Sequence, residues 1–115
     1  MTKHKHTPGP WSVHGIVQNT GSISICAGQL GIADVTNAVS AADLVLGREP
    51  KAQMANAKLI AAAPLLLDDL IAAAAQLRKY ETLHRAKGTA DSLAKAEVNA
   101  ELASRFEQTI AQVTA

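Results

Sequence analysis

The feature that most constrains this chain is a change of residue type at Pro50. Between Lys51 and about Leu83 there is no glycine, and alanine, leucine, lysine and glutamine dominate. These residues have the highest helix propensities, so the stretch predicts a long helix. Pro64 interrupts it, because proline lacks a backbone donor and clashes with the preceding turn. We therefore expect a kink or a helix restart at that position.

A second helix is expected after Lys87 and Gly88. Thr89 can cap it, and it should run from about Ala90 to Val113. Its apolar residues recur at three- and four-residue spacing, which places them along one stripe. They are Leu102, Phe106, Ile110 and Val113. Residues 51–115 are thus predicted to form a helical hairpin.

The residues before Pro50 show the alternation typical of strands. Ser22 to Cys26 alternates polar with apolar, so Ile23 and Ile25 fall on one face. Together with residues 11–14 and 30–35 they predict an antiparallel β-meander over 11–36, in which Leu30, Ile32 and Val35 face the core. Residues 1–10 are expected to form a mobile tail and 37–50 a connector. The fold class is α+β, in one domain spanning 1–115.

Composition limits the classes of function. The formal net charge is +1, which provides no sustained positive field for nucleic acid. A single cysteine, Cys26, fits a reducing cytoplasm, and the apolar runs are too short to span a bilayer. We therefore expect a cytoplasmic protein that binds neither membrane nor nucleic acid. Apolar groups on several sides of the helix around residues 65–71 predict a homo-oligomer.

Catalytic groups are not apparent in the sequence. Asp68 and Asp69 are adjacent on the predicted helix and therefore point about 100° apart. His4, His6 and His14 lack the spacing of a metal site. We therefore expect no enzyme activity, no metal and no cofactor.

Asn56 is unusual because asparagine is a poor residue for a helix interior. It is either a buried amide that ties the helix to the sheet or a ligand contact. Near the helix end, Arg78 and Arg85 either stabilise the negative helix terminus or, with Arg105, form an anion pocket between subunits. The candidate ligand-binding residues are Asn56, Lys58, Arg78, Arg85 and Arg105.

Two phrases, HTPGPW at residues 6–11 and ANAKLIAAAP at 55–64, resemble those of a widespread group of small phage and prophage proteins. A short meander followed by two helices also resembles the phage anti-Thoeris sponge family. That resemblance implies a homo-oligomer in the host cytoplasm that sequesters cyclic ADP-ribose isomers, and in some members cyclic oligonucleotides. It aligns Asn56 with a ligand-contacting asparagine. With aromatics at only 3%, the stacking partner is unassigned. The alternative is a phage module that inhibits a host protein through its helical face.

Overall fold

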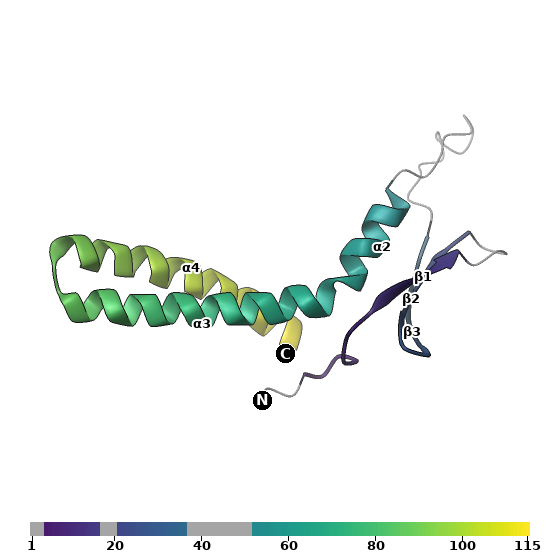
Figure 1. Ribbon diagram of the computed structural model, residues 1–115, viewed down its shortest axis with the longest axis horizontal. Helices are drawn as coiled ribbons and strands as arrows, with labels where there is room; N and C mark the ends of the chain where they lie inside the picture. Colours follow the sequence, from purple (N-terminus) through teal and green to yellow (C-terminus); the bar gives the residue numbers. More distant parts are fainter. Residues whose placement is uncertain (1–3, 17–20, 37–51) are drawn as a thin grey trace. The chain divides into compact units, whose positions relative to one another are not determined.

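The computed structural model describes residues 4–16, 21–36 and 52–115. The predicted connector at 37–50 lies outside these residues. The described elements are β1 (Ser12–Ile16), β2 (Ile23–Ala27), β3 (Leu30–Val35), α2 (Gln53–Ala61), α3 (Ala63–Lys87) and α4 (Ala90–Thr114) (Figure 1). A three-stranded antiparallel sheet followed by long helices confirms the predicted α+β class.

The chain divides into two compact units, Met1–Leu65 and Leu66–Ala115. The first holds the sheet, α2 and the first three residues of α3, and the second holds the rest of α3 and α4, which form a hairpin. The prediction of one domain over residues 1–115 stays a prediction. Among the described residues no single helix is long and apolar enough to cross a membrane, although α2 and α3 pass by length and composition as a bent pair.

The sheet has the order β1-β2-β3, and its buried face is the one predicted for β2. Ile23 and Ile25 are 2% and 0% exposed and form a core with Val35 and Ala57. The side chain of Ala57 is small, so α2 can approach the sheet closely. Helix α2 therefore belongs with the sheet, and the predicted hairpin begins only at α3.

The prediction that Leu30 faces the core is wrong, because this side chain is 63% exposed. The register between β2 and β3 shifts between Ile25 and Cys26, which leaves one extra residue on β3. Beyond the shift, Val35 pairs with Ile23 in the core. Leu30 pairs with Ala27 at the end of the sheet, outside the core cluster.

The long helix predicted from Lys51 is broken at Ala62, where α2 ends and α3 begins. Pro64 is the second residue of α3, in the first turn, where a missing N–H costs no intrahelical bond. The predicted helix restart is confirmed. The expected start of α4 is also confirmed, because the hydroxyl of Thr89 accepts a hydrogen bond from the N–H of Ser92 at 3.1 Å.

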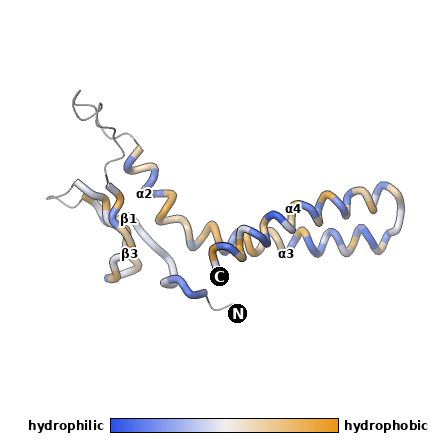
Figure 2. Tube along the Cα trace, turned by 180° about the vertical axis from the view of Figure 1, so that it is seen from behind, coloured by the Kyte–Doolittle hydropathy of each residue, from blue (hydrophilic) through white to orange (hydrophobic). Residues whose placement is uncertain are grey.

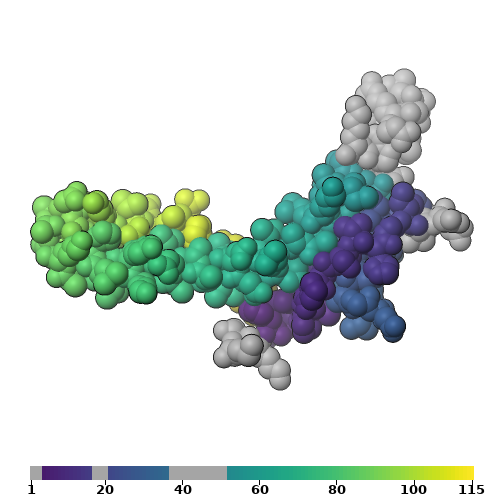
Figure 3. Space-filling view, in the orientation of Figure 1, coloured from purple at the N-terminus to yellow at the C-terminus, as the bar shows by residue number. Residues whose placement is uncertain are grey.

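The hairpin packs through small side chains. Its buried apolar residues are Ala74 of α3 and Ala96 and Ala103 of α4, at 4%, 0% and 0% exposure. The predicted stripe on α4 is only half-buried at Leu102, Phe106 and Ile110. We call the three alanines the alanine seam. Short side chains let two helix axes approach at the close end of the usual range. In the space-filling view α4 adjoins α3 near the hairpin turn and is largely hidden behind α3 farther along (Figure 3).

Candidate functional site

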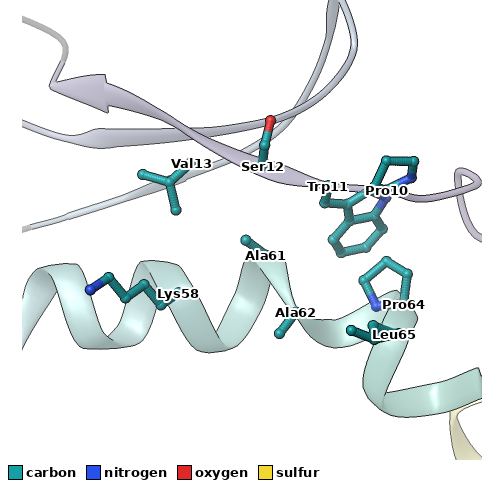
Figure 4. Close-up of a pocket in the computed structure, with 9 residues that line it drawn as sticks. All are labelled: Pro10, Trp11, Ser12, Val13, Lys58, Ala61, Ala62, Pro64 and Leu65. Carbon is teal, nitrogen blue, oxygen red and sulfur yellow. The ribbon is translucent and has the colours of Figure 1, made fainter. Parts of the chain in front are cut away.

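The two phrases singled out in the sequence meet in the first unit, where they line one pocket. Residues 10–13, which lead into β1 and form its start, make one wall, and residues of α2 and the start of α3 make the other (Figure 4). The pocket has a volume of about 340 Å³. Its lining is Pro10, Trp11, Ser12, Val13, Lys58, Ala61, Ala62, Pro64 and Leu65. It is the candidate functional site of the described residues, and we call it the Trp11 pocket.

Trp11 is held in place by the chain that precedes it. Its indole N–H donates to the carbonyl oxygen of Thr7 at 3.1 Å. The imidazole of His6 lies edge-on to the indole with ring centroids 6.2 Å apart, and His6 Nδ1 is 2.9 Å from the same carbonyl oxygen. These contacts hold the indole against residues 6 and 7, which belong to the segment that was expected to be a tail. The ring is half-buried, so part of it remains open to the pocket.

Gly9 brings this segment against the helix break. A Cβ atom at residue 9 would lie only 3.0 Å from Cβ of Pro64, which is tighter than most side-chain contacts and would require Pro64 to shift by a few tenths of an ångström. Glycine therefore permits the contact, and Pro64 is buried. One residue of each phrase thus packs against the other, so the two phrases meet in the fold.

Lys58 supplies the cation of the pocket. Its side chain is exposed and extends along α2 beneath Val13, while Trp11 stands over Pro64 and Ala61 lies between them (Figure 4). The nine lining residues include no histidine, carboxylate or cysteine. The pocket therefore presents an aromatic face and an ammonium group on an otherwise apolar wall.

Asn56 is exposed, so its interpretation as a buried amide that ties the helix to the sheet is wrong. Gln53, three residues earlier, has that role. It is 6% exposed, and its Nε2 donates to the carbonyl oxygens of Gly21 at 2.7 Å and Val35 at 3.0 Å. Gln53 faces the sheet because it lies four residues before the buried Ala57, and residues at this spacing share a helix face. Asn56 stays a predicted ligand contact.

The predicted cations Arg78 and Arg85 lie in the second unit, where they are bound to carboxylates. Arg78 contacts Glu107 at 2.6 Å and Glu81 at 2.9 Å, and its Nη2 also donates to Ser104. Arg85 contacts Glu81 at 2.9 Å and Glu97 at 3.1 Å. The side chains that link the helices are Arg78, Ser104 and Glu107 near the middle, and Arg85 and Glu97 nearer the turn.

These ion pairs perturb the titration of their members. Hydrogen bonds from Arg78, and for Glu81 also from Arg85, lower the pKa of Glu81 and Glu107. The same contacts raise the pKa of Arg78, chiefly through Glu107, and that of Arg85, chiefly through Glu81. Both guanidinium groups are thus already balanced by negative charge. A bound anion would have to displace a carboxylate from either of them.

Arg105 is exposed on α4 and, with Leu70 and Phe106, lines a second open pocket of about 360 Å³. The structure therefore brings Lys58 into a pocket, leaves Asn56 on the surface of α2, and places the three arginines on the hairpin. The sequence analysis did not single out Trp11 as a pocket residue. Trp11 also packs against the core, and the pairing of the two phrases is the signal that could have placed it in this pocket.

Among the described residues no three histidine, cysteine, aspartate or glutamate side chains gather in a group that could hold a metal ion. In comparisons with known proteins, the family model described as Salmonella phage P22 protein Y8K6 matches residues 1–112. Neither a curated protein nor a solved structure matches the chain.

Proposed function

Because the chain belongs to the family of Salmonella phage P22 protein Y8K6, we propose that it is a phage counter-defence protein. In this proposal it binds a cyclic nucleotide immune signal in the cytoplasm of the infected bacterium and sequesters it without cleaving it. The ligand class is a cyclic ADP-ribose isomer, and cyclic oligonucleotides are a second class with the same chemistry of base and phosphate.

The Trp11 pocket is the observation that carries this proposal. Its volume of about 340 Å³ falls within the range of roughly 300–1,000 Å³ typical of small-molecule sites. An indole face offers stacking to a nucleobase, which is worth about 1–3 kcal/mol per base. The ammonium group of Lys58 offers a charge-assisted hydrogen bond to a phosphate. This pairing of groups fits a nucleotide better than an apolar metabolite.

The same lining supports binding rather than hydrolysis. Cleavage of a phosphate or glycosidic bond uses a general acid or base positioned at the scissile atom. The nine lining residues offer the hydroxyl of Ser12 but no imidazole or carboxylate to activate it. A ligand held there would be retained unchanged.

The residues predicted from the sequence make different contributions to ligand binding in this proposal. Lys58 is the phosphate contact, and Asn56, exposed on the same helix, reads a polar edge of a ligand that extends beyond the pocket. Arg105 is an exposed cation on the hairpin. Arg78 and Arg85 contribute only if the ligand replaces their carboxylate partners.

Isothermal titration of the full chain with a cyclic ADP-ribose isomer tests the proposal. We expect Lys58→Ala to weaken binding by about 1–3 kcal/mol, the range for a lost charged hydrogen bond. Trp11→Phe should weaken it less, because a smaller ring is retained. Lys79→Ala is the matched control, since Lys79 is an exposed lysine outside the pocket.

Heating the complex distinguishes a sponge from an enzyme. The proposal expects intact ligand to be released on unfolding. Altered ligand would indicate catalysis, and no retained ligand would rule out the proposed class. Equal affinity for the Lys58→Ala variant and the unmodified chain would remove the Trp11 pocket from the site.

A further inference from the structure

The side chain of His6 contacts Trp11 but does not line the Trp11 pocket. The centroids of the two rings are 6.2 Å apart, and the ring planes are nearly perpendicular, at 89°. Aromatic pairs favour this edge-to-face arrangement at separations of about 4.5–7 Å. The nine residues around the pocket do not include His6. Its influence on a ligand in the pocket therefore passes through the indole.

One carbonyl oxygen joins the two rings. The indole N–H donates to the carbonyl oxygen of Thr7 at 3.1 Å, and Nδ1 of His6 lies 2.9 Å from the same oxygen. A carbonyl oxygen only accepts, so Nδ1 carries the hydrogen, and its two lone pairs can serve both donors. The imidazole and the indole are thus linked by a shared acceptor as well as by their direct contact.

His6 is itself held by a stacked ring. The imidazole of His4 lies against that of His6 with centroids 4.8 Å apart and an angle of 18° between the planes. Both histidines are half-buried. We call the rings of His4, His6 and Trp11 the aromatic row. His6 contacts both of the other rings in this row, which restricts its rotation.

Apolar burial does not account for the order of this segment. The described start of the chain is coloured hydrophilic, whereas apolar residues recur along α2 (Figure 2). Residues 4–10 include no leucine, isoleucine, valine, methionine or phenylalanine. The segment is held instead by directed contacts, which are those of the aromatic row, the hydrogen bonds to Thr7 and the close approach of Gly9 to Pro64.

These contacts orient the indole before a ligand arrives. Trp11 packs against the core cluster of the sheet unit, and its N–H is taken by Thr7. The ring is half-buried, stands over Pro64 and is open in part to the pocket (Figure 4). A ring that is already fixed loses no rotational freedom on binding, so its contacts with a ligand contribute more to affinity.

We propose that His6 is a positioning residue of the Trp11 pocket, which holds the indole in the orientation that stacks on a nucleobase. The inference rests on the proposed function, because it places the base of the ligand on the indole. His6 acts through its contact with the indole ring and through the shared carbonyl oxygen of Thr7, and it does not touch the ligand.

Three substitutions of His6 in the full chain separate its two contacts. His6→Phe keeps a ring beside the indole and removes the hydrogen bond, His6→Asn keeps a donor and removes the ring, and His6→Ala removes both. In isothermal titration with a cyclic ADP-ribose isomer, His6→Ala should bind about 3- to 10-fold more weakly, the range for one side chain that becomes ordered on binding. His6→Phe and His6→Asn should each lose less. His14→Ala is the matched control and should keep full affinity, because His14 is an exposed histidine of β1 outside the pocket lining.

The orientation of the indole is measured without ligand. Trp11 is the sole tryptophan, so acrylamide quenching of its fluorescence and the tryptophan band in near-ultraviolet circular dichroism report on this one ring. We expect His6→Ala to increase quenching and to weaken the band, with the far-ultraviolet signal unchanged. A purely structural role would lower the unfolding temperature and leave both signals of the folded chain as they were. Unchanged quenching and an unchanged band in His6→Ala would therefore overturn the proposal.

The titration separates this inference from the proposed function. An unmodified chain that binds no cyclic nucleotide would overturn the proposed function and this inference with it. An unmodified chain that binds the nucleotide, with a His6→Ala variant that keeps full affinity, would overturn the inference alone.

Discussion

The two units of this protein bury side chains of opposite size. The first unit places Ile23, Ile25 and Val35 against Ala57, so most of its buried volume comes from branched residues of the sheet. The second unit buries only alanines among its apolar residues, and its larger ones stay half-buried or exposed. A sheet covered by one short helix needs bulky side chains to fill its core. Two helices of 25 residues can instead approach each other through small ones.

This contrast predicts that the two units respond differently to substitution. The sheet unit should lose stability when a buried side chain is made smaller, and the hairpin should lose stability when a buried side chain is made larger. Trp11 is the sole tryptophan and belongs to the sheet unit, so its fluorescence reports on that unit alone. Circular dichroism at 222 nm reports chiefly on the hairpin. Denaturation followed by both signals separates the two responses.

The largest effect is expected for Ile25→Ala in the sheet unit. Ile25 is 0% exposed at the centre of the core. Its truncation should lower the free energy of unfolding by about 2–5 kcal/mol, measured by urea denaturation and Trp11 fluorescence. Ile16→Ala, on an isoleucine of the same sheet that is 65% exposed, should have little effect. Equal losses for both variants would contradict the assignment of the core.

The reverse substitution, Ala103→Leu, should destabilise the hairpin. Ala103 is 0% exposed in the alanine seam, and the added atoms would force the helices apart. We expect a loss of about 1–3 kcal/mol in urea denaturation followed at 222 nm. Ala111→Leu, on an exposed position of the same helix, is the control. A hairpin that tolerates leucine at both positions would show that the seam is not closely packed.

Gln53→Ala should lower the free energy of unfolding of the sheet unit by at most about 1–3 kcal/mol, because it leaves two carbonyl oxygens without their donor. The loss is measured by Trp11 fluorescence in urea. Asn56→Ala, an exposed amide one turn away, should be close to neutral. The opposite order would restore Asn56 as the amide that ties α2 to the sheet.

The smallest effect is expected on acidification of the hairpin. The folded pKa of Glu81 and Glu107 lies below the usual value of 4.5. Their stabilisation is therefore present above that value and is lost as the pH falls through the lowered pKa. We expect a modest decrease in the Tm at 222 nm between neutral pH and pH about 3. Arg78→Gln should reduce this pH dependence, since Arg78 is the main cause of both shifts. An unchanged slope would show that the pairs are absent in solution.

Much of the local structure could be predicted from the sequence. The strand at residues 23–27, the helix restart at Pro64 and the cap at Thr89 all follow from interactions within a few residues of one another. The burial of Ile23 and Ile25 followed from alternation in the same way. The exposure of Leu30 did not, because it depends on a register shift in the pairing with β2.

The sequence by itself determined the elements, their order and the residues that punctuate them, since propensity, capping and turn chemistry act over a few neighbours. Only the tertiary structure decided which side chains work together. Gln53 reaches a carbonyl 32 residues away, Trp11 and Lys58 line one pocket from separate phrases, and Arg78 meets Glu107 across the hairpin turn. Burial and pairing depend on contacts between distant segments. Periodicity along a single helix identifies the face that is buried but not the segment that packs against it.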